Sequence, residues 1–276
     1  HRFVDDVDRD PYAATRGLWF SHIGWMLRSY PSGEPDFACV RDLEKDPIVA
    51  WQHRHYVPLV LGTNVGLPFL VGWLSGDVWG CVLLAGFLRL VINHHVTFFI
   101  NSLAHYRGAQ PYTDRNTAKD NWFIAFFTYG EGYHNFHHIF QHDYRNGVRW
   151  YQYDPTKWLI RGLAAVGLAG RLRTTPAVTI ERAKLDMQFR RAEQRLARVP
   201  ARLDLAQLRE RVQQEYAAFV ATLAEWNAAR EQLAQAAKER VAKTLEGVDM
   251  QAYARQIERR LRAQRRRVHA LTLQMA

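Results

Sequence analysis

The chain has 276 residues and a formal net charge of +10, and 48% of its residues are hydrophobic. This length allows one large domain or two small ones. The two cysteines, Cys39 and Cys81, show no pairing pattern. This excludes a small disulfide-stabilised fold and favours a reducing compartment. Aromatic residues concentrate before about residue 160 and charged, alanine-rich sequence follows, so no average over the whole chain describes either half. The first residue is His and no signal peptide follows it, which we interpret as an amino-terminal truncation.

Two apolar segments follow a polar and aromatic region at residues 1–56. Residues 57–75 carry no charge, and at 1.5 Å per residue about 19 residues nearly cross a hydrocarbon core of roughly 30 Å. Residues 78–103 form the second apolar segment, and the turn residues Gly76-Asp77 separate the two. The sequence therefore predicts a membrane hairpin. The alternative is a buried helical hairpin in a large soluble core.

Basic residues flank both ends of this hairpin, and by the positive-inside rule both flanks are cytoplasmic. These residues are Arg28, Arg41 and Arg54 before the hairpin and Arg107, Arg115 and Lys119 after it. The apolar segments at 122–133 and 157–170 are too short to span a membrane and are typical of interfacial or buried elements. Within the second span, His94 and His95 lie about 16 Å along the helix from His105, and we interpret them as packing or tunnel-lining residues.

The charged, alanine-rich sequence at 176–276 predicts a basic helical extension. Its apolar residues recur at three- and four-residue steps, as on one face of a helix: Leu203, Leu205, Leu208, Val212, Tyr216, Phe219 and Leu223. The predicted fold is therefore all-α and integral to the membrane. A first domain, residues 1–175, comprises a cytoplasmic segment (1–56), the membrane hairpin (57–104) and a cytoplasmic, histidine-rich helical cap (105–175), and the extension follows it.

Histidines cluster in the predicted cap. His134, His137 and His138 form the pattern HNFHH, and on a helix the positions i, i+3 and i+4 share one face. Asn101 and His105 are spaced i, i+4 at the cytoplasmic end of the second span, and His1 opens the chain. Imidazole suits zinc, copper, iron and nickel, but zinc sites usually stop at four ligands. Five imidazoles and an amide exceed one zinc site and favour two metal ions, although the spacing alone does not choose iron.

Four separated motifs resemble the membrane fatty-acid desaturases, in particular the delta-9 group that acts on acyl-CoA or acyl-lipid. They are RDPYAATRGLWFSHIGWML (9–27), NSLAH (101–105), YGEGYHNFHH (129–138) and DYRNGVRWYQYDPTKWLI (143–160). The likeness covers about residues 1–175, in the order and with the gaps of the family. The resemblance implies four membrane helices, of which this chain shows two.

The resemblance also implies a di-iron centre. The third histidine box of the family matches His134, His137 and His138, and His105 matches a further ligand. Asn101 matches an amide that reaches one iron through water, and His1 matches the last histidine of the second box. The first box and the rest of the second box are absent from the sequence. We therefore expect the chain, as given, to hold only part of the site.

The implied reaction is an oxygen-dependent desaturation that introduces a cis double bond, most often at carbon nine, into a saturated acyl chain. The alternatives are a related histidine-box hydroxylase and a non-catalytic membrane interaction protein. The candidate carboxylates for orienting the imidazoles are Glu131, Asp143 and Asp120. The candidates for binding a phosphate-bearing substrate headgroup are Arg9, Arg16 and Arg28, for which plain positive-inside charge is the alternative. Trp19 and Trp25 close the tunnel mouth or lie at the membrane interface.

The sequence contains no HPGG haem motif of a fused cytochrome b5, so electrons are expected from a separate donor, either a ferredoxin, a flavoprotein reductase or cytochrome b5. The extension and the missing haem motif favour a bacterial inner membrane, with the termini and active site cytoplasmic. The basic run at 255–267 has three interpretations: binding to membrane lipid, docking of an acidic electron donor, or a solvated helix face. A nucleic-acid partner is not expected on a membrane-bound chain.

Overall fold

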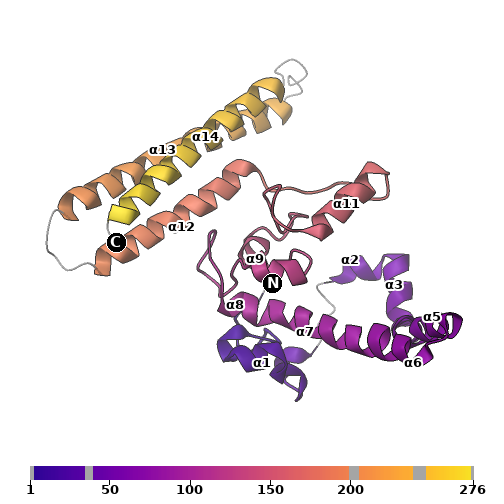
Figure 1. Ribbon diagram of the computed structural model, residues 1–276. Coiled ribbons are helices and arrows are strands. Elements are labelled where there is room, and N and C mark those ends of the chain that lie inside the picture. The colour runs from indigo at the N-terminus through magenta and orange to yellow at the C-terminus, as the bar shows by residue number, and fades with distance from the viewer. Residues whose placement is uncertain (1–2, 35–39, 199–204, 239–246, 275–276) are drawn as a thin grey trace. The chain divides into compact units, whose positions relative to one another are not determined.

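The computed structural model describes residues 3–34, 40–198, 205–238 and 247–274 (Figure 1). These residues contain helices and no strands, apart from one isolated antiparallel bridge between Asp120 and Tyr133, so the all-α prediction is confirmed for this part of the chain. The chain divides into two compact units. The first comprises His1–Gly108, Asn116–His134 and Asn146–Leu159, and the second comprises Ala109–Arg115, Asn135–Arg145 and Ile160–Ala276.

Short helices precede the membrane hairpin. They are η1 (Ala14–Arg16), α1 (Leu18–His22), η2 (Gly24–Met26), η3 (Pro31–Gly33), α2 (Arg41–Glu44) and α3 (Pro47–Arg54). Helix α3 begins where the Asp46 carboxylate accepts hydrogen bonds from the backbone N–H groups of Ile48 and Val49, with Pro47 at the first helical position. Helix α1 packs against the second span of the hairpin, which brings the amino-terminal segment to the carboxyl-terminal part of that span.

Two helical stretches are long and apolar enough to cross a membrane, Tyr56–Ser75 and Val78–Tyr106. The first contains α4 (Tyr56–Leu61), the π-helical turn η5 (Gly62–Gly66) and α5 (Leu67–Ser75), and the second contains α6 (Val78–Gly80), π-helical η6 (Cys81–Leu88), α7 (Arg89–Asn101) and α8 (Leu103–Tyr106). Only 11% and 6% of their most apolar windows are buried. Such exposed apolar helices differ from the core helices of a soluble protein, and the prediction of two apolar spans is confirmed.

Glycines set the geometry of this hairpin. Gly76 ends α5 in the left-handed conformation, with φ of 84°, and Asp77 then accepts a hydrogen bond from the backbone N–H of Gly80 at 2.8 Å. A Cβ added at Gly72 would lie 2.6 Å from Val78 Cα, and one at Gly86 would lie 2.7 Å from the backbone oxygen of Asn64. The two helices therefore approach closely because these positions carry no side chain.

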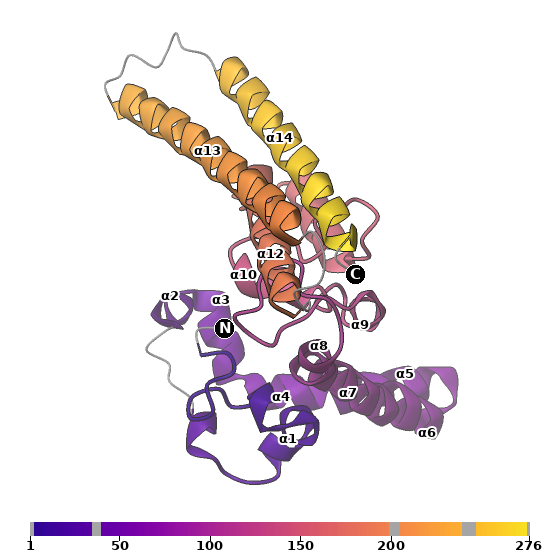
Figure 2. The ribbon, with the colours of Figure 1, turned by 90° about the vertical axis from the view of Figure 1, so that its left-hand side faces the viewer.

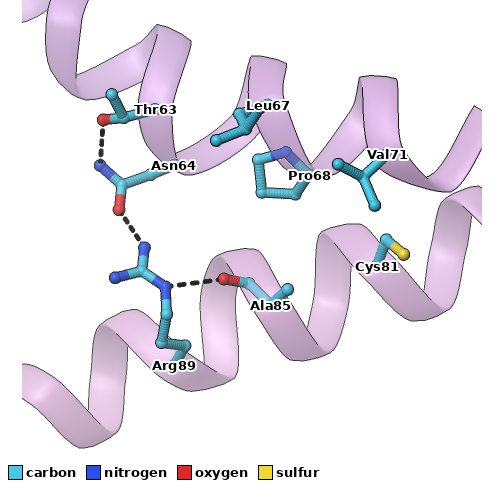
Figure 3. A pocket seen from close by; sticks show the side chains of 8 residues that line it. All are labelled: Thr63, Asn64, Leu67, Pro68, Val71, Cys81, Ala85 and Arg89. Carbon is cyan, nitrogen blue, oxygen red and sulfur yellow. Dashed lines mark hydrogen bonds between the residues drawn. The ribbon is translucent and has the colours of Figure 1, made fainter.

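A polar pair lies between the two apolar helices (Figure 3). The Arg89 guanidinium donates hydrogen bonds to Asn64 Oδ1 on the facing helix and, at 2.8 Å, to the carbonyl of Ala85. Beside the pair is a cavity of about 410 Å³. Its lining residues are Thr63, Asn64, Leu67, Pro68, Val71, Cys81, Ala85 and Arg89.

The histidine-rich region and the extension are also helical. The remaining helices are α9 (Trp122–Phe127), α10 (His134–Ile139), α11 (Pro155–Ala165), α12 (Ala177–Arg198), α13 (Leu205–Lys238) and α14 (Gly247–Gln274). Helix α14 lies against both α12 and α13, so the extension forms a three-helix bundle (Figure 2). Its core residues are Val178, Leu185, Phe189, Ala192, Val212, Phe219, Ile257, Leu261, Val268 and Leu271.

The predicted apolar stripe of the extension is only partly a core stripe. Val212 and Phe219 are core residues, and Leu208 and Leu223 pack against the core. Tyr216 is 48% exposed. Leu203 lies outside the described residues, and nothing is described of the Leu205 side chain. The boundary at residue 175 stays a prediction.

Candidate metal centre

His105 lies just past a distorted turn in the second span. Helix α7 ends at Asn101, Ser102 has φ of −109° and ψ of −74°, which departs from ideal helical values, and α8 continues from Leu103. Ser102 Oγ donates to the carbonyl of Phe98 at 2.8 Å and lies 3.0 Å from His22 Nδ1. His105 is buried, with a residue exposure of 8%.

A pair of polar residues fixes the protonation of the His105 ring. The Asp5 carboxylate accepts two hydrogen bonds from Thr117, one from its backbone N–H at 2.6 Å and one from its hydroxyl at 2.5 Å. Because that hydroxyl donates to Asp5, it accepts from His105 Nδ1, which lies 2.8 Å away. Nδ1 therefore carries the proton, and Nε2 presents its lone pair to the site. Such outer hydrogen bonds commonly orient metal-binding histidines.

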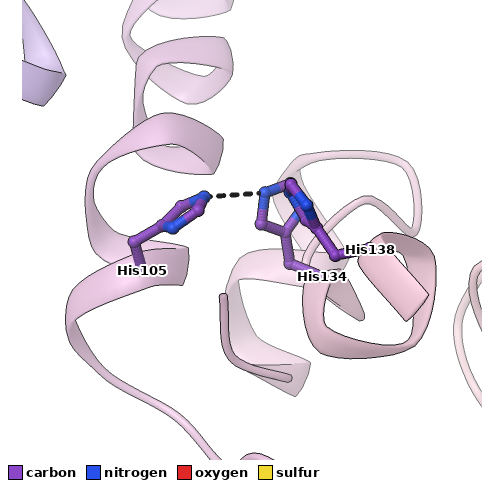
Figure 4. Close-up of side chains that lie close together, drawn as sticks. All are labelled: His105, His134 and His138. Carbon is purple, nitrogen blue, oxygen red and sulfur yellow. Dashed lines mark hydrogen bonds between the residues drawn. The ribbon is translucent and has the colours of Figure 1, made fainter. Parts of the chain in front are cut away.

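His134 and His138 face the same point from α10. His134 Nε2 lies 3.0 Å from His105 Nε2, and their rings point toward each other (Figure 4). His138 follows His134 by one helical turn, and one ligand nitrogen from each of these three histidines lies within 4.8 Å of the others. Two imidazoles bound to one ion at about 2.0–2.1 Å are separated by at most roughly 4.2 Å. The three residues therefore fit a metal ion with small side-chain movements.

The two residues of HNFHH that are not histidines hold α10 in place. Asn135 is fully buried, and its Oδ1 accepts from the backbone N–H of Tyr112 at 2.9 Å while its Nδ2 donates to the carbonyl of Thr113 at 2.9 Å. Phe136 is 1% exposed and packs edge-on against Tyr112, with ring centroids 5.3 Å apart. Within the motif, His134 and His138 thus face the cluster, whereas Asn135 and Phe136 anchor the helix.

The loop after α10 is held by a carboxylate that the sequence reasoning missed, and the loop before α10 packs against the same carboxylate. Asp154 is fully buried and accepts backbone hydrogen bonds from Asn146 and Gly147, both at 2.8 Å. Gly130 has φ of 107°, and a Cβ there would lie 2.7 Å from Asp154 Oδ1. Gly130, the first glycine of the YGEGY segment, therefore leaves room for the Asp154 carboxylate that a side chain would fill.

The structure brings three of the six predicted ligands together. Asn101 is the last residue of α7 and is half-buried. The His137 ring lies 6.0 Å from that of His138 but is outside the three-histidine group. His1 lies outside the described residues. The roles of these three residues stay predictions.

The candidate orienting carboxylates have different surroundings. Burial raises the pKa of Glu131, whose carboxylate accepts a hydrogen bond from Asn146 at 3.4 Å. Asp120 pairs through its backbone with Tyr133, directly before His134. Asp143 instead binds Arg145 through two hydrogen bonds and accepts from the backbone N–H of Thr175 at 2.7 Å. Its oxygens are thus engaged by partners that are not imidazoles.

The predicted headgroup arginines and the two tryptophans of the amino-terminal segment differ in their surroundings. The Arg16 guanidinium lies 4.0 Å from the Phe20 ring centroid, and that of Arg9 lies 5.1 Å from the Phe3 centroid. Arg28 is exposed on the same segment. Trp19 is 69% exposed, which suits an interfacial position. Trp25 is half-buried and packs edge-on against Tyr12.

A second histidine contact lies in the span. His95 Nδ1 is 3.1 Å from His22 Nε2, and the two rings stack. His94 stacks on Phe98. Both histidines make packing contacts, and neither belongs to the metal-binding group among the described residues.

These features define a helical protein with two apolar spans and a buried histidine cluster at the end of one of them. The family description that matches residues 1–172 is fatty acid desaturase, and the chain belongs to that family. It is 45% identical to acyl-CoA desaturase 1 of Saccharomyces cerevisiae over 200 residues, which is 72% of this chain and 39% of the yeast protein. It is 32% identical to an sn-1 stearoyl-lipid 9-desaturase of Anabaena variabilis over 173 residues, 63% of this chain and 61% of that protein. The chain thus spans only part of the curated relatives it matches.

Proposed function

We propose that this chain belongs to an oxygen-dependent fatty-acyl desaturase that introduces a cis double bond at carbon nine of a saturated acyl chain. The relatives named above are desaturases of acyl-CoA and of stearoyl-lipid, which supports acyl-CoA or acyl-lipid as the substrate. The observation that carries the proposal is the convergence of three imidazoles from α8 and α10, with the tautomer of His105 fixed by Thr117.

The proposed ligands of two iron ions are His105, His134 and His138, completed by His137, Asn101 and His1 together with histidines that precede this sequence in the family. The abstraction of hydrogen from an unactivated C–H bond is beyond any side chain, and it is chemistry that bound iron supplies together with O2 and two electrons. The chain itself provides neutral nitrogen ligands in a buried setting. Thr117 and Asp5 hold the His105 ring so that its Nε2 faces the centre.

The proposal extends to the setting of the site. The basic residues that flank the hairpin support a cytoplasmic active site, and the extension and the missing haem motif support a bacterial inner membrane. Electrons would come from a separate ferredoxin, flavoprotein reductase or cytochrome b5. Arg9, Arg16 and Arg28 are the proposed contacts of a phosphate-bearing headgroup, because all three are exposed on the segment that packs at the end of the second span.

The test is production of unsaturated fatty acid in a host without its own desaturase. Because the resemblance implies that further ligands precede His1, the expressed chain is extended to include them. We expect a new cis-monoene that depends on oxygen and is lost in His138→Ala. The matched control is His142→Ala, which removes an exposed histidine one turn further along the sequence. A hydroxylated product would instead support the hydroxylase, and wild-type product from His138→Ala would exclude this site.

A further inference from the structure

Helix α14 carries arginines on the face opposite to the bundle core. Ile257, Leu261, Val268 and Leu271 lie in the core at steps of three or four residues and multiples of them. The opposite face carries four exposed arginines at the same spacing, and we call them the arginine stripe: Arg255, Arg259, Arg262 and Arg266. At 1.5 Å per residue the stripe is about 16 Å long.

The remaining arginines of the basic run serve the bundle. Arg260 pairs with Glu225 at 2.8 Å, Arg267 pairs with Glu215 at 2.6 Å, and Arg265 lies 3.4 Å from Glu181. These glutamates belong to α12 and α13, so the pairs tie α14 to its neighbours and neutralise the flanking positions. The fold therefore divides the basic run into cations that pair with glutamates of α12 and α13 and cations on the outward face.

The guanidinium groups of the arginine stripe lie on the exposed face of α14. Arg262 pairs with Glu258 within α14, and among the described residues no ion pair involves Arg259 or Arg266. The only large hydrophobic side chain exposed on the described part of α14 is Leu273. A protein partner normally requires a buried apolar or aromatic anchor at the centre of the interface. A surface that presents charge without such an anchor suits a diffuse anionic layer.

We propose that the arginine stripe binds the anionic phospholipid headgroups of a membrane surface. Guanidinium groups bind phosphate through paired hydrogen bonds, and each arginine near an anionic surface strengthens binding roughly five-fold. The apolar face of α14 is occupied by the bundle core, so the helix binds through charge and does not insert. This contact is independent of the proposed enzymatic activity.

The experiment uses the whole chain in nanodiscs of phosphatidylcholine, with Cys39 and Cys81 replaced by serine and a donor fluorophore on His269→Cys. Vesicles that carry an acceptor-labelled lipid, with or without phosphatidylglycerol, are titrated against it. We expect energy transfer only with phosphatidylglycerol, and its loss at about 1 M salt, where the screening length falls to roughly 3 Å.

Two charge-matched variants decide the assignment. The double variant R259Q/R266Q removes stripe charge, and we expect it to weaken vesicle binding roughly 25-fold. The control R260Q/R267Q removes the same charge from positions that are already paired with glutamates, and we expect it to keep near-wild-type binding with unchanged helical circular dichroism. Equal weakening in both variants, or binding that ignores phosphatidylglycerol, would overturn the proposal. Stripe-dependent binding of polyglutamate without vesicle binding would also overturn it and indicate an acidic protein partner.

Discussion

Replacement of Thr117 by valine tests how the metal-facing tautomer of His105 is set. Valine keeps the shape of threonine but removes the hydroxyl that accepts from His105 Nδ1 at 2.8 Å and donates to Asp5 at 2.5 Å. Loss of a hydrogen bond at a buried polar group costs about 1–3 kcal/mol. Removal of the outer partner of a metal-binding histidine typically weakens metal binding 10–100-fold. Both magnitudes agree, because about 1.4 kcal/mol corresponds to a ten-fold change in affinity.

The assay is titration of the detergent-solubilised chain with Co²⁺, followed by visible absorption. We expect Thr117→Val to bind Co²⁺ 10–100-fold more weakly than the wild type. Asp5→Asn should change the affinity in the same direction, because the amide still contacts Thr117 but no longer holds it as a charged acceptor. The control is Thr63→Val, whose hydroxyl bonds only within the first span and lies outside the histidine group. An unchanged Co²⁺ affinity in a folded Thr117→Val protein would refute the tautomer argument.

Three further outcomes are expected. His138→Ala should abolish Co²⁺ binding, whereas His142→Ala should not, and equal loss in both would mean that the cluster is not the site. Gly86→Ala should destabilise the hairpin by about 1–3 kcal/mol in thermal unfolding, because the added Cβ would lie 2.7 Å from the backbone of the facing helix. Gly62→Ala should leave the stability unchanged, because no atom lies within 4 Å of a Cβ added there. Burial opposes ionisation of Asp143, but hydrogen bonds from Arg145 and Thr175 outweigh it and hold the pKa of Asp143 below its ordinary 3.8. The stability that Asp143 contributes is therefore present above pH 3.8 and is lost as the pH falls through the lowered pKa. Denaturant titrations of Asp143→Asn should lack this acid-side loss, and an unchanged acid limb would contradict it.

The parts of the site that depend on local spacing were predictable from the sequence. HNFHH places His134 and His138 one turn apart on any helix, and the charge-free residues 57–75 require an apolar span. The support for His105 was not predictable, because Asp5 and Thr117 are separated by 112 residues and meet only in the folded chain. No local pattern marks an aspartate as the partner of a distant threonine.

The extension was likewise predictable from the sequence only in part. Its apolar spacing predicted a helix with one buried face, but the sequence did not show which helices cover that face. From the sequence, the basic run at 255–267 is one continuous basic surface. In the structure, Arg260 and Arg267 instead pair with glutamates of another helix, so only part of the run faces outward. Pairing across helices is a tertiary property, and periodicity along one helix does not contain it.

The Arg89–Asn64 bond has a consequence for how the chain enters a bilayer. Arg89 lies about 16 Å along the second span from Val78, near the middle of a hydrocarbon core of roughly 30 Å. An arginine at that depth costs about 2.5–3.5 kcal/mol on the insertion scale. Asn64, on the preceding helix, offers its amide oxygen to this guanidinium and lowers that cost only when both helices are present. The two spans are therefore expected to leave the translocon as a pair, with the first helix waiting beside the channel until the second has been synthesised.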